Sequence, residues 1–592
     1  MKQAARKMAL LAMGFACVAL ALSALGGEKV ELNPNAFFVS PDGSDENPGT
    51  LEAPFRTIRH AVVRAVRGMT VYVRAGVYDE LVWITEKYGN PEKIFTLENY
   101  PGERPTIDRN CKDQYGIVVM SRYATVRGFE LRNIKGDPTY KVSMAALTVG
   151  NDAHHVVLEN NLIHHVIGGG RAARGIHVAE GAHDILIQNN TVHNITGNAE
   201  SMGIQVDGAA AVTIRRNLVY FADKEAIRLI TQDTDTENVV EENIVLHSAM
   251  GMAINHARTT KQILVRNNFC GWNWARGMNP KHTRNITVEH NTFVGNEDWG
   301  YDSHGNGSLD GDVAYLTLKN NLFSRNRSEW WLNEREVLYE TVDYNFYDHA
   351  GNDPLASFNW SDADQCHTLK DIQEKTRNKG ALNGPYETNG KEGVAGFVAP
   401  EKGDYRLKPD SAARGAVEEG KDAGVIEGTL VEVGADHAWG LRNIPDLGMI
   451  PLTVQTVSSE TEKGPAKGAV DASRRTYWEA LFEKDPNPEI VLDLPGEAPY
   501  ALTDVILTKP DGGARYFYKD FAIETDDGSG QWVPVAAPAA HPFSGYRGLQ
   551  NGETWSMPQG TKACRVKIRV LTGYGNAIQM PGIRIYGTSA KE

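Results

Sequence analysis

The sequence predicts an all-β protein in which a parallel β-helix is followed by an antiparallel β-sandwich. Three observations lead to this prediction. Asparagine-centred segments repeat through the middle of the chain, the residues around them alternate between apolar and polar, and after Leu447 the strands continue without the asparagine repeat. The chain has 592 residues, which is too long for one compact core.

The repeat consists of short strands that each contain an asparagine. Neighbouring asparagines are 23 to 30 residues apart, at Asn161, Asn190, Asn217, Asn243, Asn268, Asn291, Asn321 and Asn345. A repeat of about 26 residues with short alternating strands fits one coil of a parallel β-helix, whereas a propeller blade needs roughly 40. We expect the asparagines to lie at sharp turns, in left-handed conformations, and to stack in a hydrogen-bonded column.

Several segments resemble the secreted right-handed parallel β-helix proteins that act on carbohydrates. They read FVSPDGS at 38–44, NPGT at 47–50, PFRTI at 54–58 and VYVRAGVY at 71–78, with a related closing segment, GDYRLKP, at 403–409. The resemblance covers about residues 37–415 and implies a right-handed β-helix, with a short helix at 59–67 capping its open end. Because this fold supports lyases, hydrolases, epimerases and adhesins, the resemblance leaves the reaction open.

The C-terminal region has no asparagine repeat, and its strands are separated by Gly, Pro and Asp turns, which predicts a β-sandwich. The segments AVDASRRTYW at 469–478, DDGS at 526–529 and IRIYG at 583–587 resemble the discoidin-like, coagulation-factor type C family of galactose-binding-like jelly rolls. This resemblance implies a carbohydrate-binding module, in which aromatic faces stack on sugar rings. The candidate binding residues are Tyr516, Tyr518, His541, Tyr546 and Arg547.

The N-terminus has the pattern of a secretory signal peptide, with three basic residues before an apolar run that ends in small residues. The predicted organisation is a signal peptide at 1–26, a catalytic β-helix domain at 27–415, a linker at 416–450 and a binding module at 451–592. We therefore expect a secreted protein, extracellular or periplasmic, with no membrane contact after cleavage and a monomeric state. The net charge is −14, and −17 after cleavage, which argues against nucleic acid as a partner.

Titratable side chains gather on the strand that precedes each asparagine strand. Alternation should point the apolar residues inward and the next residues outward. The outward column is Thr148, His177, Gln205, Arg228, Ala253, Asn279 and Asp302, and the following positions add Glu180, Asp207, Asn255, His256, Lys281, His282 and His304. Such a column suits a polysaccharide groove. We expect Trp272, Trp274, Arg276 and Trp299 to form its walls.

The first candidate reaction is β-elimination on a uronate polysaccharide. It requires a base beside the carboxylate and neutralisation of charge by Ca²⁺ or by Arg, Asn or His donors. Lys281 is the candidate base, because neighbouring cations such as Arg276 would lower its pKa, while Arg228, His256 and Asn279 would hold the carboxylate. The segments NPKHTRN at 279–285 and HNTF at 290–293 also resemble the catalytic-lysine coil of the chondroitinase-B-like alginate lyases, which implies the same role for Lys281.

Two alternatives stay open. A glycoside hydrolase would use two carboxyl groups about 5 Å or about 6.5–9.5 Å apart. Its candidates are Glu180, Asp207, Glu225, Asp233, Asp298 and Asp302. A non-catalytic adhesin would only bind the glycan. No nucleotide, zinc or nucleophile-elbow motif is present, so we expect no organic cofactor, and the sequence identifies no metal-ligand set beyond the possibility of Ca²⁺.

Overall fold

The computed structural model describes most of the chain. The described residues are 31–85, 89–112, 115–136, 144–168, 172–197, 201–231, 235–255, 261–303, 313–332, 337–358, 365–377, 385–471, 476–508, 518–536, 553–573 and 575–589. The expected signal peptide at 1–26 lies outside them. Among the described helices, none is long and apolar enough to cross a membrane.

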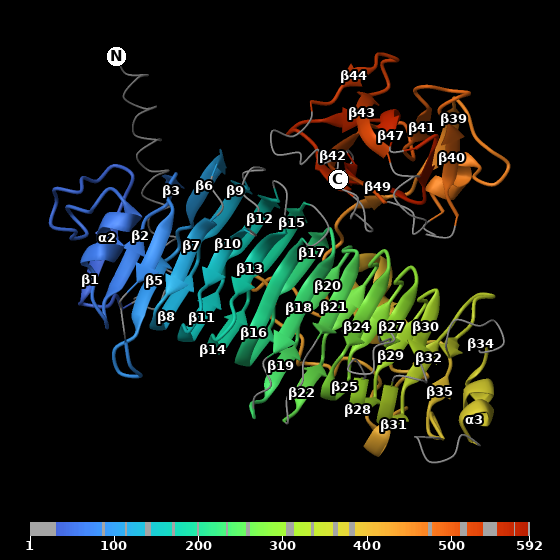
Figure 1. Cartoon of the computed structure of the whole chain (residues 1–592), viewed down its shortest axis with the longest axis horizontal. Helices are drawn as coiled ribbons and strands as arrows, with labels where there is room; N and C mark the ends of the chain where they lie inside the picture. The colour runs from blue at the N-terminus through green and yellow to red at the C-terminus, as the bar shows by residue number, and fades with distance from the viewer. Residues whose placement is uncertain are drawn as a thin grey trace, which may run out of the picture.

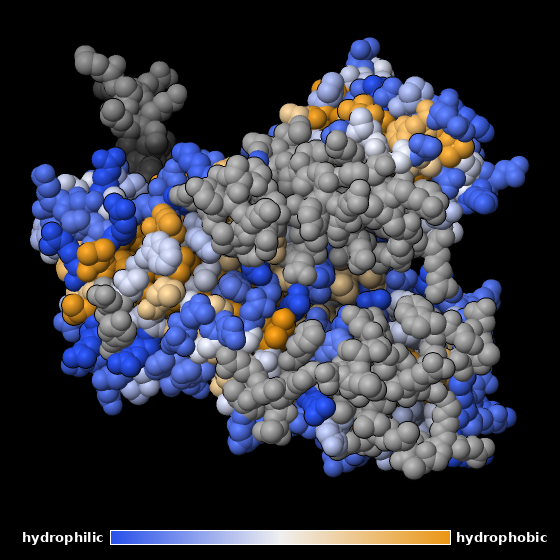
Figure 2. Space-filling view, viewed as in Figure 1, coloured by the Kyte–Doolittle hydropathy of each residue, from blue (hydrophilic) through white to orange (hydrophobic). Residues whose placement is uncertain are grey.

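The chain forms a β-helix with a smaller sandwich beside it (Figure 1). Each coil of the β-helix contributes a strand to sheet C, then to sheet A, then to sheet B, and strands of successive coils pair in parallel. This arrangement is the predicted parallel β-helix. In the view of Figure 2, hydrophilic side chains cover much of the described surface, with smaller hydrophobic areas between them.

The strands of the three sheets have the following bounds. Sheet A contains β1 (Ala36–Val39), β2 (Thr70–Val73), β5 (Phe95–Asn99), β8 (Arg122–Arg127), β11 (His154–Glu159), β14 (His183–Gln188), the second half of β16 (Met202–Arg215), β19 (Asn238–Glu241), β22 (Ile263–Arg266), β25 (Arg284–Glu289), β28 (Val313–Lys319) and β31 (Val337–Asp343). Sheet B contains β3 (Gly76–Tyr78), β6 (Pro105–Lys112), β9 (Glu130–Lys135), β12 (Leu162–Ile167), β15 (Thr191–Thr196), β17 (Leu218–Ala222), β20 (Ile244–Leu246), β23 (Phe269–Gly271), β26 (Thr292–Val294), β29 (Leu322–Ser324), β32 (Phe346–Asp348) and β35 (Lys391–Glu392). Sheet C contains β4 (Val82–Thr85), β7 (Tyr115–Met120), β10 (Met144–Val149), β13 (Ala173–Val178), the first half of β16, β18 (Glu225–Thr231), β21 (Met250–Asn255), β24 (Arg276–Lys281), β27 (Trp299–Ser303), β30 (Ser328–Leu332), β33 (Ala356–Phe358) and the antiparallel β34 (Gln365–Cys366).

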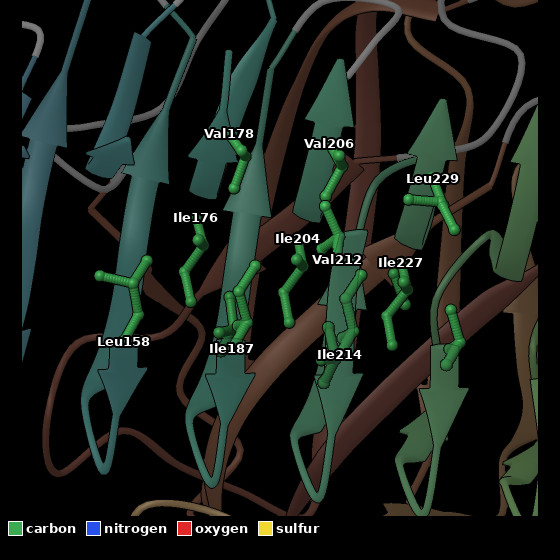
Figure 3. Close-up of a cluster of buried hydrophobic side chains, with 14 of the residues drawn as sticks. Leu158, Ile176, Val178, Ile187, Ile204, Val206, Val212, Ile214, Ile227 and Leu229 are labelled. Atoms are coloured by element: carbon green, nitrogen blue, oxygen red, sulfur yellow. The ribbon is translucent and has the colours of Figure 1, made fainter. Parts of the chain in front are cut away.

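The core lies inside the coils, where apolar side chains of one sheet meet those of the others. Figure 3 shows Ile176 and Val178 of β13 pointing towards Leu158 of β11 and Ile187 of β14. The same positions recur in the next coils because the strands keep their register. At the N-terminal end, α2 (Ile58–Arg64) packs on β1, β2 and β4 and confirms the expected capping helix, while α3 (Leu369–Arg377) follows the last coils.

The asparagine column is confirmed as a buried hydrogen-bonded ladder. From Asn161 to Asn345, each side-chain amide donates to the carbonyl oxygen of the next asparagine side chain at 2.9–3.1 Å. The expected left-handed conformation, however, belongs to the residue before each ladder asparagine, such as Asn160 (φ 56°) or Glu242 (φ 56°). The residue before the asparagine therefore adopts the left-handed conformation of the turn, and the asparagine side chain faces inward.

The expected linker at 416–450 is largely a packed segment, which we call the strap and define as residues 395–447. It contains β36 (Phe397–Ala399) and β37 (Asp404–Leu407) and covers the outer face of sheet B. The backbone N–H of Gly424 donates to Asn320 O at 2.9 Å, and that of Gly434 donates to Arg216 O at 2.9 Å. Its apolar residues pack on sheet B, which a repeat-based search for domains could not foresee.

The C-terminal domain is the predicted antiparallel sandwich. One sheet contains β38 (Met449–Ile450), β42 (Tyr500–Leu507), β45 (Glu553–Ser556), β46 (Lys562–Ala563) and β49 (Ile583–Ser589). The other contains β39 (Thr453–Val457), β41 (Glu489–Asp493), β43 (Tyr518–Asp526), β44 (Val533–Pro534) and β47 (Arg565–Gly573), and a separate pair joins β40 (Trp478–Leu481) to β48 (Ala577–Met580). A core of its own fills the space between the sheets.

Candidate active site

The outer face of sheet C carries the predicted column of polar residues. The strand register pairs Thr148 with His177, His177 with Gln205, and Gln205 with Arg228. It then continues through Ala253 to Asn279, and the pairing of β24 with β27 brings Asp302 next. Because Ile176, Ile204 and Ile227 point into the core, the intervening side chains lie on the opposite face of the sheet.

Lys281 lies at the end of β24, half-buried, opposite Asn255 of the preceding coil. Burial lowers the pKa of its amine, and the nearby charges of Arg276 and Lys224 lower it further. Asp302 acts in the other direction, and Arg228 adds a smaller lowering effect. Within the described part of the chain, the side-chain oxygen of the buried Asn255 has no hydrogen-bond partner, so this acceptor is available in the coil beside the amine.

Asp302 lies beneath the surface of sheet C, at the C-terminal end of the column. Its side chain is fully buried and forms an ion pair with Arg276, whose guanidinium lies 5.5 Å from the centre of the Trp299 ring. Asn279 Nδ2 donates to the backbone oxygen of Asp302 at 2.8 Å. These contacts fix Arg276 and Asn279 beside Lys281, and they leave Asp302 with a supporting position rather than one open to a substrate.

A second polar cluster surrounds Asp207, four coils before Asp302. Gln205 Nε2 donates to both carboxylate oxygens at 2.7 Å, and His177 Nε2 lies 3.2 Å from Asp207 Oδ2. Burial raises the pKa of Asp207, but the His177 and Gln205 contacts outweigh it and hold this pKa below its usual value. Burial lowers the pKa of His177. Arg174 completes the cluster, with Nη2 3.7 Å from Asp207 Oδ2 and a hydrogen bond to Gln205.

Two predicted groove residues lie elsewhere. Trp274 is fully buried in a cluster with Ile506 and Tyr586 of the sandwich, so it packs the two domains together. Trp272 stacks on His247 with ring centroids 5.5 Å apart, and it lines a pocket of about 210 Å³ between the β-helix, the strap and β38. Of the three predicted tryptophans, only Trp299 belongs to sheet C.

The remaining predicted residues divide into two groups. His282 is buried in the turn after β24, with a left-handed backbone (φ 53°). His256, His304, Tyr516, His541, Tyr546 and Arg547 lie outside the described residues, as does the side chain of Tyr518. Sequence reasoning missed Arg174. It lies near the start of β13, before the stretch in which strict alternation could be read, so only its charge next to sheet C could have singled it out.

Two family models match the chain, the first within the β-helix and the second within the sandwich. Residues 37–321 match the model of the Pel9A-like, right-handed β-helix region. Residues 454–581 match the model of the F5/8 type C domain. Each match falls within one of the two domains. The Pel9A-like match also supplies the right-handed sense of the β-helix, and the F5/8 type C match confirms the discoidin-like sandwich.

Similar proteins match shorter stretches. Pectate lyase PEL9 of Emericella nidulans is 42% identical over 73 residues, which is 12% of this chain and 18% of that protein. Uncharacterized protein YwoF of Bacillus subtilis is 28% identical over 131 residues, which is 21% of this chain and 28% of that protein. The chain therefore matches less than a third of the length of each of these relatives.

Two solved structures align with parts of the chain. The structure of pectate lyase Pel9A aligns with 69% of this chain and 97% of that one, at 13% identity and a TM-score of 0.42. CpGH89CBM32-5 from Clostridium perfringens, solved with GalNAc-β-1,3-galactose, aligns with 24% of this chain and all of that one, at 17% identity and a TM-score of 0.21.

Proposed function

We propose that this protein is an extracellular polysaccharide lyase that cleaves a uronate polysaccharide by β-elimination on the outer face of sheet C. The observation that carries the proposal is the position of Lys281, a half-buried amine whose pKa is lowered by burial and by Arg276 and Lys224. The match to a protein named pectate lyase supports polygalacturonate as the first substrate to test.

Lys281 acts as the base in this proposal. Its neutral Nζ takes the proton from the carbon next to the uronate carboxylate. The electron pair left behind forms a double bond to the neighbouring carbon, whose bond to the glycosidic oxygen breaks. That oxygen takes a proton from water. The lowered pKa of Lys281 matters because only the neutral amine can accept the substrate proton.

Arg228 and Arg276 stabilise the negative charge that develops on the carboxylate. Both lie close enough to Lys281 to affect its pKa, and Arg276 is held in place by the buried Asp302. A guanidinium suits this task because it stays charged and presents several donors to a carboxylate. His256 and Asn255 complete the proposed substrate contacts, together with Trp299 as a stacking surface.

The alternative of a carboxylate pair is less well supported. Gln205 and Asp302 are four coils apart in the register, so Asp207 and Asp302 are separated by roughly 19 Å along the β-helix axis. That distance exceeds the separation of about 6.5–9.5 Å that an inverting hydrolase uses. Asp302 is also fully buried against Arg276.

The expected Ca²⁺ ion stays a prediction. On sheet C, the described carboxylates of Asp207, Glu225 and Asp302 each contact a basic side chain, at His177, Lys224 and Arg276 respectively. None of these three carboxylates belongs to the group of described His, Cys, Asp and Glu side chains that lie close enough together to hold a metal ion. No step of the proposed mechanism therefore passes through a metal.

The experiment is to incubate the purified protein with polygalacturonate, alginate and neutral polysaccharides. Two signals are followed, the ultraviolet absorbance of unsaturated uronate and the formation of reducing ends. We expect both signals to rise together on an acidic polysaccharide. New reducing ends without the absorbance would identify a hydrolase. Retained binding without either signal would identify an adhesin, and both results would refute the proposal.

A further inference from the structure

Three histidines and one aspartate lie together at the start of two adjacent strands of sheet A. We propose that His154, His155, His183 and Asp184 bind a divalent transition-metal ion, with Zn²⁺ as the natural occupant. This inference concerns a different sheet from Lys281 and does not rest on the proposed lyase activity.

The register of the β-helix brings the four residues together. His154 begins β11 and pairs with His183, which begins β14 in the next coil. The residues that follow, His155 and Asp184, both have left-handed backbones, with φ of 53° and 56°. A left-handed residue interrupts the strict alternation of a strand, so two consecutive side chains can reach the same surface. The side chains of His155, His183 and Asp184 are between 41% and 46% exposed.

The ring nitrogens already lie close to one another. His154 Nδ1 is 2.8 Å from His155 Nδ1, and the rings of His154 and His183 stack 4.6 Å apart at 8°. One nitrogen from each of the three histidines lies within 4.8 Å of the other two. Asp184 Oδ2 is 2.7 Å from His183 Nδ1 and 3.7 Å from His155 Nδ1, which places a carboxylate beside two of the three rings.

The donor set selects the class of ion. Imidazole nitrogens with one carboxylate suit Zn²⁺, Ni²⁺ or Cu²⁺, whereas Ca²⁺ and Mg²⁺ prefer oxygen ligands. Metal binding requires neutral imidazoles, which histidine side chains provide near neutral pH. Tyr123 of the preceding coil stacks on His155 with centroids 4.3 Å apart, which helps to hold that ring in place.

Sheet B contains a second trio of histidines, whose contacts differ from those of the sheet A trio. In sheet B, His164 and His165 are adjacent, and the His164 ring stacks on that of His193 at 5.0 Å. There, however, His164 Nε2 contacts Glu130 at 3.0 Å, and Asn194 replaces the aspartate and donates to Asp504 of the sandwich. In sheet B, Asn194 beside the trio therefore contributes to domain packing, whereas the sheet A trio is half open to solvent.

An ion at the sheet A trio would join β11 to β14 and so stabilise two coils against separation. The test uses untagged, full-length protein freed of metal with a chelator and then titrated with ZnCl₂ by calorimetry. Thermal unfolding is measured with and without one equivalent of Zn²⁺. We expect the wild type to bind Zn²⁺ and to unfold at a higher temperature when it is bound.

The double variant His154→Ala/His183→Ala should bind one Zn²⁺ fewer and lose the shift in Tm. His155→Ala, which removes an exposed ring and leaves the strands intact, should weaken the binding and keeps the test valid if the double variant folds poorly. His437→Ala, at an exposed position in the strap, serves as the control and should behave as the wild type. The inference is overturned if the double variant and His155→Ala bind as many Zn²⁺ ions, with the same affinity, as the wild type.

Discussion

The proposed role of Lys281 as a base depends on its place in the stacked coils rather than on its immediate sequence. The nearest charges come from three different strands or turns: Arg276 at the start of β24, Lys224 before β18, and Arg228 within β18. Only the stacking of coils brings these cations to one amine. Together with burial they favour its neutral form, which is the form that a base in β-elimination needs.

The pH dependence of the reaction tests this charge environment. Replacement of Lys224 by Gln removes a positive charge that lowers the pKa of Lys281, so the pKa of Lys281 should rise. The ascending limb of kcat/KM against pH should then move to higher pH, because more base is needed to deprotonate the amine. Lys224→Arg keeps the charge and should leave the limb in place. An unchanged profile in Lys224→Gln would show that Lys281 is not the titrating base.

At the scale of single residues, the sequence predicted side-chain directions correctly within strands, where apolar and polar residues alternate, and wrongly at the turns. It placed His177, Gln205, Arg228 and Asn279 in one column because each lies within a strand of period two. It misplaced Trp272, which follows β23 with a left-handed backbone (φ 53°). At such a turn the side-chain direction no longer follows from counting residues.

At the scale of the structural element, the asparagine ladder ends on a buried acid. Asn345 Nδ2 and the Tyr347 hydroxyl both donate to Glu387 Oε1 at 2.7 Å. A second ladder through Asn273, Asn296 and Asn326 ends in the same way on Glu329. Glu387 lies 42 residues beyond Asn345, outside the repeat, so the sequence period predicted the ladder but not its terminus.

The protonation of Glu387 should therefore affect stability. Burial raises its pKa from 4.5 to about 7, so the folded state retains a proton that the unfolded chain has already lost between these values. The free energy of unfolding should consequently fall as pH rises from about 4.5 to about 7, by about 3 kcal/mol from this group. Glu387→Gln should remove this part of the pH dependence, measured by denaturant unfolding at several pH values. The exposed control Glu432→Gln should retain it, and an unchanged pH dependence in Glu387→Gln would contradict this explanation.

At the scale of the whole molecule, the sandwich is docked on the β-helix rather than tethered to it. Arg584 forms a buried ion pair with Glu297, and its guanidinium lies 5.3 Å from the Trp274 ring centre. The Tyr586 hydroxyl lies 3.0 Å from His247 Nδ1, and Asn194 donates to Asp504 at 2.7 Å. The sequence predicted both domains but not this interface, because the contacts join residues about 300 positions apart.

Trp274→Ala tests whether this interface couples the two domains. Loss of a fully buried tryptophan should cost about 3–5 kcal/mol, much of it at the junction. We expect calorimetry to show one joint unfolding transition for the wild type and separate transitions for Trp274→Ala. Trp299→Ala, on sheet C and outside the cluster that Trp274 forms with Ile506 and Tyr586, should keep the joint transition. If Trp274→Ala also kept it, the interface would not be what couples the domains.

The most direct test of the proposed chemistry is the turnover of Lys281→Ala on the acidic polysaccharide that the wild type degrades. Unsaturated product is followed by its ultraviolet absorbance, and Lys261→Ala serves as a matched control because Lys261 is an exposed lysine of the same domain. We predict that Lys281→Ala lowers kcat by about 10²- to 10⁴-fold, with its folding intact, while Lys261→Ala keeps wild-type turnover. Full elimination activity in Lys281→Ala would contradict the central claim that Lys281 is the base.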